Sequence, residues 1–169
     1  MEGQINILLV EDTETDAEIV KRALSKTMKS PFRIVRAETM AQAEASLRSI
    51  SNVDLILLDL GLPDTKGGID TFQRLENAKK YNIPTLILTS VHDRNLAMDI
   101  VGGGAEDYIR KSRLSREPES LCDAIEFALC RHKNVVGLKE KNEKALAEKD
   151  QIIHYMTGGY SVQPSNPTH

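Results

Sequence analysis

Five short runs of apolar or alternating residues recur along the chain, and each has the length of a β-strand. They occupy residues 5–10, 32–37, 54–60, 84–90 and 107–111. Other segments carry apolar residues at every third or fourth position, which predicts helices at residues 14–29, 40–50, 68–81, 95–104 and 118–133. The pattern therefore predicts strands and helices in regular alternation.

Several of the predicted strands are apolar at nearly every position. The run "LILL" at residues 55–58 is an example. Apolar strands that alternate with helices indicate a parallel sheet with both faces covered. Five such units predict an α/β fold of the doubly wound, flavodoxin-like type, built on a five-stranded parallel sheet.

A charge-rich segment with helical character follows the last predicted helix, so we expect an extended C-terminal helix. Its apolar residues approximate a heptad seam at Val135, Leu138, Ala145, Ile152 and Met156, with Asn142 and Lys149 in the intervening seam positions. Both a coiled coil, which would make a homodimer, and a solvated extension of the helix fit this pattern. Because turn-forming residues follow, we divide the chain into residues 1–133, a helical extension at 134–157 and a disordered tail at 158–169.

Composition and charge exclude several classes of protein. The net charge is -3 and the pI about 5.8, so we expect no binding to nucleic acid or to an anionic membrane. No apolar run approaches the roughly 20 residues of a membrane span, and the N-terminus lacks the basic start of a signal peptide, which favours the cytoplasm. Cys122 and Cys130 lie too far apart along one predicted helix to form a disulfide, and their surroundings do not suggest a metal site.

Polar residues follow the predicted strands directly. They are Glu11, Asp12, Asp59, Thr89 and Lys111. In an open α/β sheet, ligands bind at the carboxyl ends of the strands, so we expect these side chains to share one edge of the sheet. Taken singly, an aspartate such as Asp12 or Asp64 also fits a helix cap or a turn; the combination of residues points to a site.

These residue types suit phosphoryl transfer. Clustered carboxylates repel one another unless a cation lies among them, and Mg²⁺ prefers oxygen ligands. Asp59 can act as a carboxylate nucleophile that accepts a phosphoryl group. Thr89 can donate its hydroxyl to a phosphoryl oxygen, and Lys111 supplies a positive charge for the same group.

The segments "ILLVEDTETD", "LILLDLGLPDTKG", "IPTLILTS" and "GAEDYIRKS" resemble those of response-regulator receiver domains, which act in two-component phosphorelay signalling. The resemblance covers about residues 4–132. It implies that Asp59 is the phosphoacceptor and that Glu11 and Asp12 form an acidic pair, with Asp12 the more direct Mg²⁺ ligand. The backbone carbonyl of Gly61 would be a further metal ligand. The resemblance also assigns the remaining site roles: a switch hydroxyl, a phosphate-pairing lysine and an aromatic switch residue at Thr89, Lys111 and Tyr108.

The resemblance further implies a phosphorylation-controlled switch rather than an enzyme with a substrate of its own. Its phosphodonor would be a histidine kinase or a histidine phosphotransfer protein, and its output a contact with a downstream protein that the sequence does not name. Ser112 stands where the family usually has proline after the lysine, so we expect a trans bond and a differently shaped loop there. Gly61 leaves a bare backbone beside the phosphoryl position.

Three other readings remain open at this stage. A phosphatase with an aspartate nucleophile needs a second acid two residues after it, where Gly61 stands. A nucleotide or flavin binder would have a glycine-rich turn after the first strand, but the sequence there is the acidic "VEDTETD". A receiver-like interaction module that acts without phosphorylation would carry the same fold.

Overall fold

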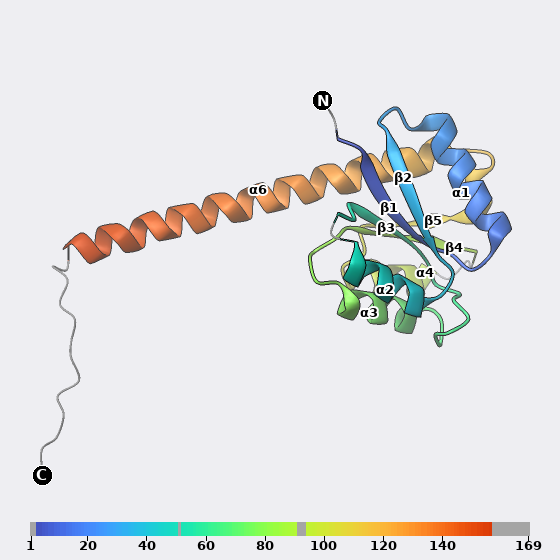
Figure 1. Cartoon of the computed structure of the whole chain (residues 1–169), viewed down its shortest axis with the longest axis horizontal. Coiled ribbons are helices and arrows are strands. Elements are labelled where there is room, and N and C mark those ends of the chain that lie inside the picture. Colours follow the sequence, from blue (N-terminus) through green and yellow to red (C-terminus); the bar gives the residue numbers. More distant parts are fainter. Residues whose placement is uncertain (1–2, 51, 91–93, 157–169) are drawn as a thin grey trace, which may run out of the picture. The chain divides into compact units, whose positions relative to one another are not determined.

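The computed structural model describes residues 3–50, 52–90 and 94–156. Its strands are β1 (Ile5–Val10), β2 (Phe32–Ala37), β3 (Leu55–Asp59), β4 (Thr85–Thr89) and β5 (Asp107–Arg110). Its helices are α1 (Glu14–Thr27), α2 (Met40–Ser49), α3 (Ile69–Ala78), α4 (Arg94–Gly102), α5 (Lys111–Leu114) and α6 (Glu119–Met156). The predicted alternation is confirmed, and the long last helix with it (Figure 1).

All five strands lie in one parallel sheet with the order β2-β1-β3-β4-β5. The chain places β2 on one side of β1 and β3 on the other. The carboxyl ends of β1 and β3 therefore form the switch point where open α/β sheets bind their ligands. The predicted fold class, a doubly wound five-stranded parallel sheet, is confirmed.

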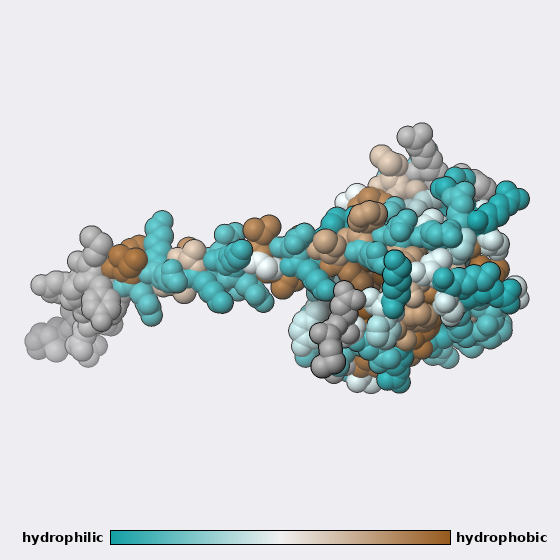
Figure 2. All heavy atoms as spheres, turned by 90° about the horizontal axis from the view of Figure 1, so that it is seen from above, coloured by the Kyte–Doolittle hydropathy of each residue, from teal (hydrophilic) through white to brown (hydrophobic). Residues whose placement is uncertain are grey.

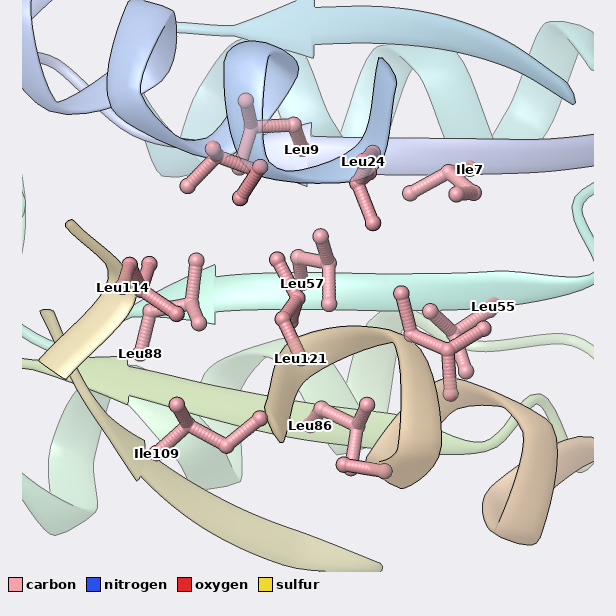
Figure 3. Packing of buried hydrophobic residues seen from close by; sticks show 14 of the residues in the cluster. Ile7, Leu9, Leu24, Leu55, Leu57, Leu86, Leu88, Ile109, Leu114 and Leu121 are labelled. Atoms are coloured by element: carbon pink, nitrogen blue, oxygen red, sulfur yellow. The ribbon is translucent and has the colours of Figure 1, made fainter. Parts of the chain in front are cut away.

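Each face of the sheet has its own hydrophobic core, because successive side chains of a strand point to opposite faces. One core lies under α1 and α6 and includes Ile7, Leu9, Leu24, Leu55, Leu57, Leu86, Leu88, Ile109, Leu114 and Leu121 (Figure 3). The other lies under α2, α3 and α4 and includes Leu8, Val10, Met40, Ile56, Leu58, Phe72, Leu75, Ile87 and Ile100. Burial on both sides explains why the strands are apolar throughout, and each buried leucine contributes about 2 kcal/mol.

Most predicted elements differ from the observed ones by a few residues at their ends, and two of these differences involve lysine residues. The fifth strand ends at Arg110, one residue early, and Lys111 starts the short helix α5. Leu114, at the end of that helix, is buried in the core under α1 and α6, which draws the chain into a turn. The bond after Lys111 is trans, as predicted from Ser112. The helix predicted at 68–81 ends at Ala78, where the backbone of Lys79 becomes extended, and Lys79 Nζ donates a hydrogen bond to the carbonyl oxygen of Ile83 (2.7 Å).

Helix α6 belongs to both of the compact units into which the chain divides. The first unit ends at His132 and the second begins at Lys133. No helix in the described part of the chain is long and apolar enough to cross a membrane. Cys122 and Cys130, both on α6, are free thiols. The tail predicted at 158–169 lies outside the described residues.

Candidate functional site

Three acidic side chains meet at the carboxyl ends of β1 and β3. Asp59 is the last residue of β3, and Glu11 and Asp12 follow β1 directly. Val10 pairs with Leu58, so the next residues of both strands lie side by side. One carboxylate oxygen from each of the three residues lies within 4.8 Å of the others.

Glu11 is fully buried, which is rare for a charged residue and requires a partner. Its Oε2 lies 2.6 Å from Lys111 Nζ in an ion pair, and its Oε1 accepts a hydrogen bond from the backbone N–H of Thr13 (3.2 Å). Burial raises the pKa of Glu11 and the charge of Asp59 adds to this, although Lys111 opposes the rise. Among the described residues, none donates a well-directed hydrogen bond to Oε2.

Lys111 is buried at the centre of the acidic residues. Its Nζ lies 2.6 Å from Glu11 Oε2, 2.9 Å from Asp16 Oδ2 and 3.3 Å from Asp59 Oδ1. Burial by itself would lower the pKa of Lys111. The hydrogen bonds and charges of the carboxylates outweigh that effect and raise the pKa to about 12. Lys111 is therefore a firmly charged ammonium held against several acids.

Asp16, on the first turn of α1, was not singled out in the sequence. It accepts the well-directed hydrogen bond of Lys111. Helical spacing does not link Asp16 to Asp12, because α1 begins only at Glu14, two residues after Asp12. The four carboxylates of Glu11, Asp12, Asp16 and Asp59 outnumber the single ammonium at this edge of the sheet.

Arg36, near the end of β2, fixes the backbone of the acidic turn and was also missed. Its Nε donates to the carbonyl oxygen of Glu11 (2.9 Å) and its Nη2 to that of Asp12 (2.7 Å). It also pairs with the carboxylate of Glu14. Arg36 therefore holds the turn in place without adding its charge to the carboxylate cluster itself.

The loop after Asp59 is fastened by its backbone. The carbonyl oxygen of Leu60 accepts hydrogen bonds from Thr71 Oγ1 (3.0 Å) and from the N–H of Gly68 (3.2 Å). A β-carbon at position 61 would lie 3.4 Å from Asp59 Oδ2. Because Gly61 has no side chain, the space beside this oxygen stays open. One side of the carboxylate is thus bordered by backbone alone.

Thr89 and Tyr108 lie on neighbouring strands. Thr89 is the buried last residue of β4, one position beyond Leu88, which pairs with Asp59 of β3. Tyr108 pairs with Ile87 across β4 and β5 and packs, half-buried, against the core under α2, α3 and α4. Of the residues predicted for the site, Glu11, Asp12, Asp59 and Thr89 lie at the carboxyl ends of β1, β3 and β4, whereas Tyr108 lies within β5 and Lys111 starts α5.

Asp64 caps helix α2, which is one of the roles that the sequence suggested for this residue. Its Oδ1 and Oδ2 accept hydrogen bonds from the N–H groups of Met40 and Ala41, at the start of α2. Burial pushes the pKa of Asp64 up, but the backbone hydrogen bonds outweigh it and the pKa is lowered. Asp64 therefore belongs to the scaffold.

The residues fit Mg²⁺. Carboxylate oxygens of Glu11, Asp12 and Asp59 converge, and Asp12 is exposed. Hard cations bind such oxygen sets, and a site with more negative than positive charge favours them.

Comparisons with known proteins agree with this geometry. The family described as "Response regulator receiver domain" matches residues 7–126. The cell cycle transcriptional regulator CtrA of Caulobacter vibrioides is 35% identical over 107 residues, which are 63% of this chain and 44% of that protein. The two-component response regulator ORR8 of Oryza sativa is 31% identical over 106 residues, or 63% of this chain and 85% of that protein. The chain thus spans less than half of the length of CtrA.

Solved structures show the same fold. The phosphorylated cyanobacterial phytochrome response regulator RcpA is 26% identical, with a TM-score of 0.59 over 70% of this chain and 91% of its own. A response regulator receiver domain protein of Clostridium thermocellum is 21% identical, with a TM-score of 0.64 over 78% of this chain and 98% of its own. With its sheet, its acidic edge and the match over residues 7–126, the chain belongs to the response regulator receiver domain family.

Proposed function

We propose that the chain is a phosphorylation-controlled switch in which Asp59 accepts a phosphoryl group. The observation that carries the proposal is that Asp59, Glu11, Asp12 and Lys111 converge at the switch point of the sheet. In-line phosphoryl transfer requires mainly positioning and neutralisation of charge, and these groups supply both. The phosphodonor would be the phosphohistidine of a histidine kinase or of a histidine phosphotransfer protein.

In the proposed transfer, a carboxylate oxygen of Asp59 attacks phosphorus and forms an acyl phosphate. The bond between phosphorus and the donor imidazole breaks, and the imidazole leaves with the electron pair. Lys111 holds the oxygens that carry the transferred charge, and Thr89 donates its hydroxyl to one of them. Bound Mg²⁺, held by Glu11, Asp12, Asp59 and the carbonyl oxygen of Gly61, would neutralise negative charge on the phosphoryl group. Water later attacks phosphorus and releases phosphate, which resets the switch.

We propose that Thr89 and Tyr108 carry the signal away from Asp59. Tyr108 lines a groove together with Met98 and Val101 of α4 and Ala124 of α6. Movement of Thr89 toward the phosphoryl group would let Tyr108 change position and reshape this groove for a downstream protein. A differential contact of about 1.4 kcal/mol shifts such an equilibrium tenfold.

Other features of the proposal concern the whole protein. We place the receiver at residues 1–133 and a helical extension at 134–157, through which the chain associates with itself. We expect action in the cytoplasm, without nucleic acid. A phosphatase is not favoured, because Gly61 replaces the second acid that this reaction requires. A receiver that acts without phosphorylation is the alternative that the following experiment tests.

Beryllofluoride mimics the phosphoryl group and provides the test. With Mg²⁺ present, we expect it to shift the amide NMR signals of Asp59, Thr89 and Tyr108. Asp59→Asn removes the negative oxygen that beryllium binds, so the response should be lost, whereas Asp123→Asn on the exposed side of α6 should keep it. Equal responses of the wild type and of Asp59→Asn would refute the switch.

A further inference from the structure

The helical unit that begins at Lys133 carries an apolar stripe. The side chains of Val135, Leu138, Leu146, Ile152 and Ile153 are between 49% and 62% exposed. At 100° per residue, these five positions fall within about 120° of the helix circumference, which places them on one side of the helix. Figure 2 shows these hydrophobic side chains among hydrophilic ones along the helix. Large exposed apolar side chains in a row indicate a binding surface.

The pattern within the stripe favours another helix as the partner. Val135, Asn142 and Lys149 follow one another at seven-residue steps, and so do Leu138, Ala145 and Ile152. A seven-residue repeat keeps the same side of a helix against a partner helix over several turns. A membrane surface would not accept Asn142 and Lys149 in the middle of the apolar side. The stripe is therefore a helix-pairing seam.

Charges beside the stripe are distributed unevenly along the helix. In the heptad of the seam, the flanking positions that carry charge are Lys139 and Lys141 in the first half and Glu148 in the second half, whereas the other charged residues lie farther from the seam. A copy of this segment that runs in the same direction would place Lys149 against Lys149 in the seam. A copy that runs in the opposite direction would bring Lys141 against Glu148. Opposite charges across a helix pair set its orientation.

We propose that residues 135–153 pair with the same segment of a second copy of the chain in an antiparallel arrangement. In the register that matches the seam, Val135 lies opposite Ile152 of the second copy, and Asn142 lies opposite Ala145. Lys149 lies opposite Leu138, where its long stem covers the apolar side chain while its ammonium reaches water. Lys141 pairs with Glu148 of the second copy twice, once on each side of the symmetry axis. This pairing rests on the self-association proposed above and is independent of the chemistry of Asp59.

Mass measurements on the full chain test the surface. We expect light scattering to give the mass of two chains, and Val135→Glu to weaken association at least about 100-fold, because it buries a charge opposite the apolar Ile152 of the second copy. Val136→Glu is the matched control. Val136 is an exposed apolar residue of the same helix turn but lies outside the stripe, so the dimer should persist. A single-chain mass for the wild type at every concentration, or the mass of three chains, would overturn the proposal.

Disulfide trapping tests the orientation. In a Cys130→Ser background, which removes the exposed native thiol, a mixture of Leu138→Cys and Lys149→Cys chains should form a disulfide between the two variants. Leu138→Cys alone should not, because its two thiols would lie about 16 Å apart along the axis, far beyond disulfide reach. Efficient self-linking of Leu138→Cys would show a parallel pair and would refute the antiparallel arrangement. Failure here would leave the beryllofluoride response of Asp59 unchanged, so the two proposals can fail separately.

Discussion

A single ammonium group organises the acidic edge of the sheet. Lys111 Nζ contacts the carboxylates of Glu11, Asp16 and Asp59, which lie directly after β1, on α1 and at the end of β3. Its well-directed hydrogen bond goes to Asp16 and not to Asp59. Lys111 is therefore held from the side of α1 and remains close enough to Asp59 to meet a group that is added there.

This arrangement predicts an alkaline loss of stability. The pKa of Lys111 is raised from 10.5 to about 12 in the folded chain, so the ion pairs stabilise the fold fully below pH 10.5. They should lose about 2 kcal/mol as the pH rises through that window. In Asp16→Asn, Lys111 has one charged partner fewer, so we expect a smaller loss that is complete at lower pH. Urea unfolding at a series of pH values measures it.

Glu18→Gln serves as the control for that experiment, since Glu18 lies on the same helix but pairs with Lys21 at the surface. Its alkaline loss should match that of the wild type. The interpretation is wrong if Asp16→Asn and the wild type lose stability over the same pH window.

Part of the site could be predicted at the residue scale. Glu11, Asp12 and Asp59 were recognisable because each directly follows an apolar strand, and parallel strands end at one edge. Asp16 and Arg36 were not, because their roles depend on where a long or flexible side chain points. Sequence spacing gives the side of the helix or strand on which a residue lies, but not the atom to which it donates or from which it accepts.

The short helix α5 connects the site to the core. Lys111 at its start faces the acids, and Leu114 at its end is 2% exposed and lies in the core under α1 and α6. Hydrophobic burial therefore determines where the helix lies. The sequence predicted the strand before α5 but not α5 itself. Four residues are too few to show a helical period, and the position of this helix depends on the burial of Leu114 in the core.

Leu114→Ala should lower the free energy of unfolding by about 2–5 kcal/mol, because it leaves a cavity in the core. Ser112→Ala changes an exposed residue of the same turn and should alter the free energy by less than about 0.5 kcal/mol. Urea denaturation of both variants measures the difference. Equal, small losses would show that the core does not hold α5.

The excess of negative charge at the acidic edge affects the stability of the first unit as a whole. Four carboxylates share the edge with one lysine, so the folded state carries local repulsion that a divalent cation would relieve.

The regular alternation of strands and helices made the fold predictable, because each element is long enough to show its period. The direction and pairing of the extension depend on a second copy, which the sequence of one chain does not describe.

Adding Mg²⁺ should therefore raise the thermal midpoint. At 100 times its dissociation constant, it would add about 2.7 kcal/mol to the free energy of unfolding. Asp12→Asn removes an exposed ligand and should reduce this gain, while Glu119→Gln, an exposed acid on α6, should not. Calorimetry with and without Mg²⁺, at constant ionic strength, measures the effect. The same gain in all three chains would mean that the cation binds elsewhere.

The turn of α5 has a mechanical consequence. Within one helical turn, the chain connects the ammonium of Lys111, which is held by carboxylates, to the methyl groups of Leu114, which are buried in the core. No glycine lies between these two residues, so the connection is short and rigid. A rearrangement of charge at one end is therefore transmitted to the interior at the other end, and α1 is the helix that packs against α5.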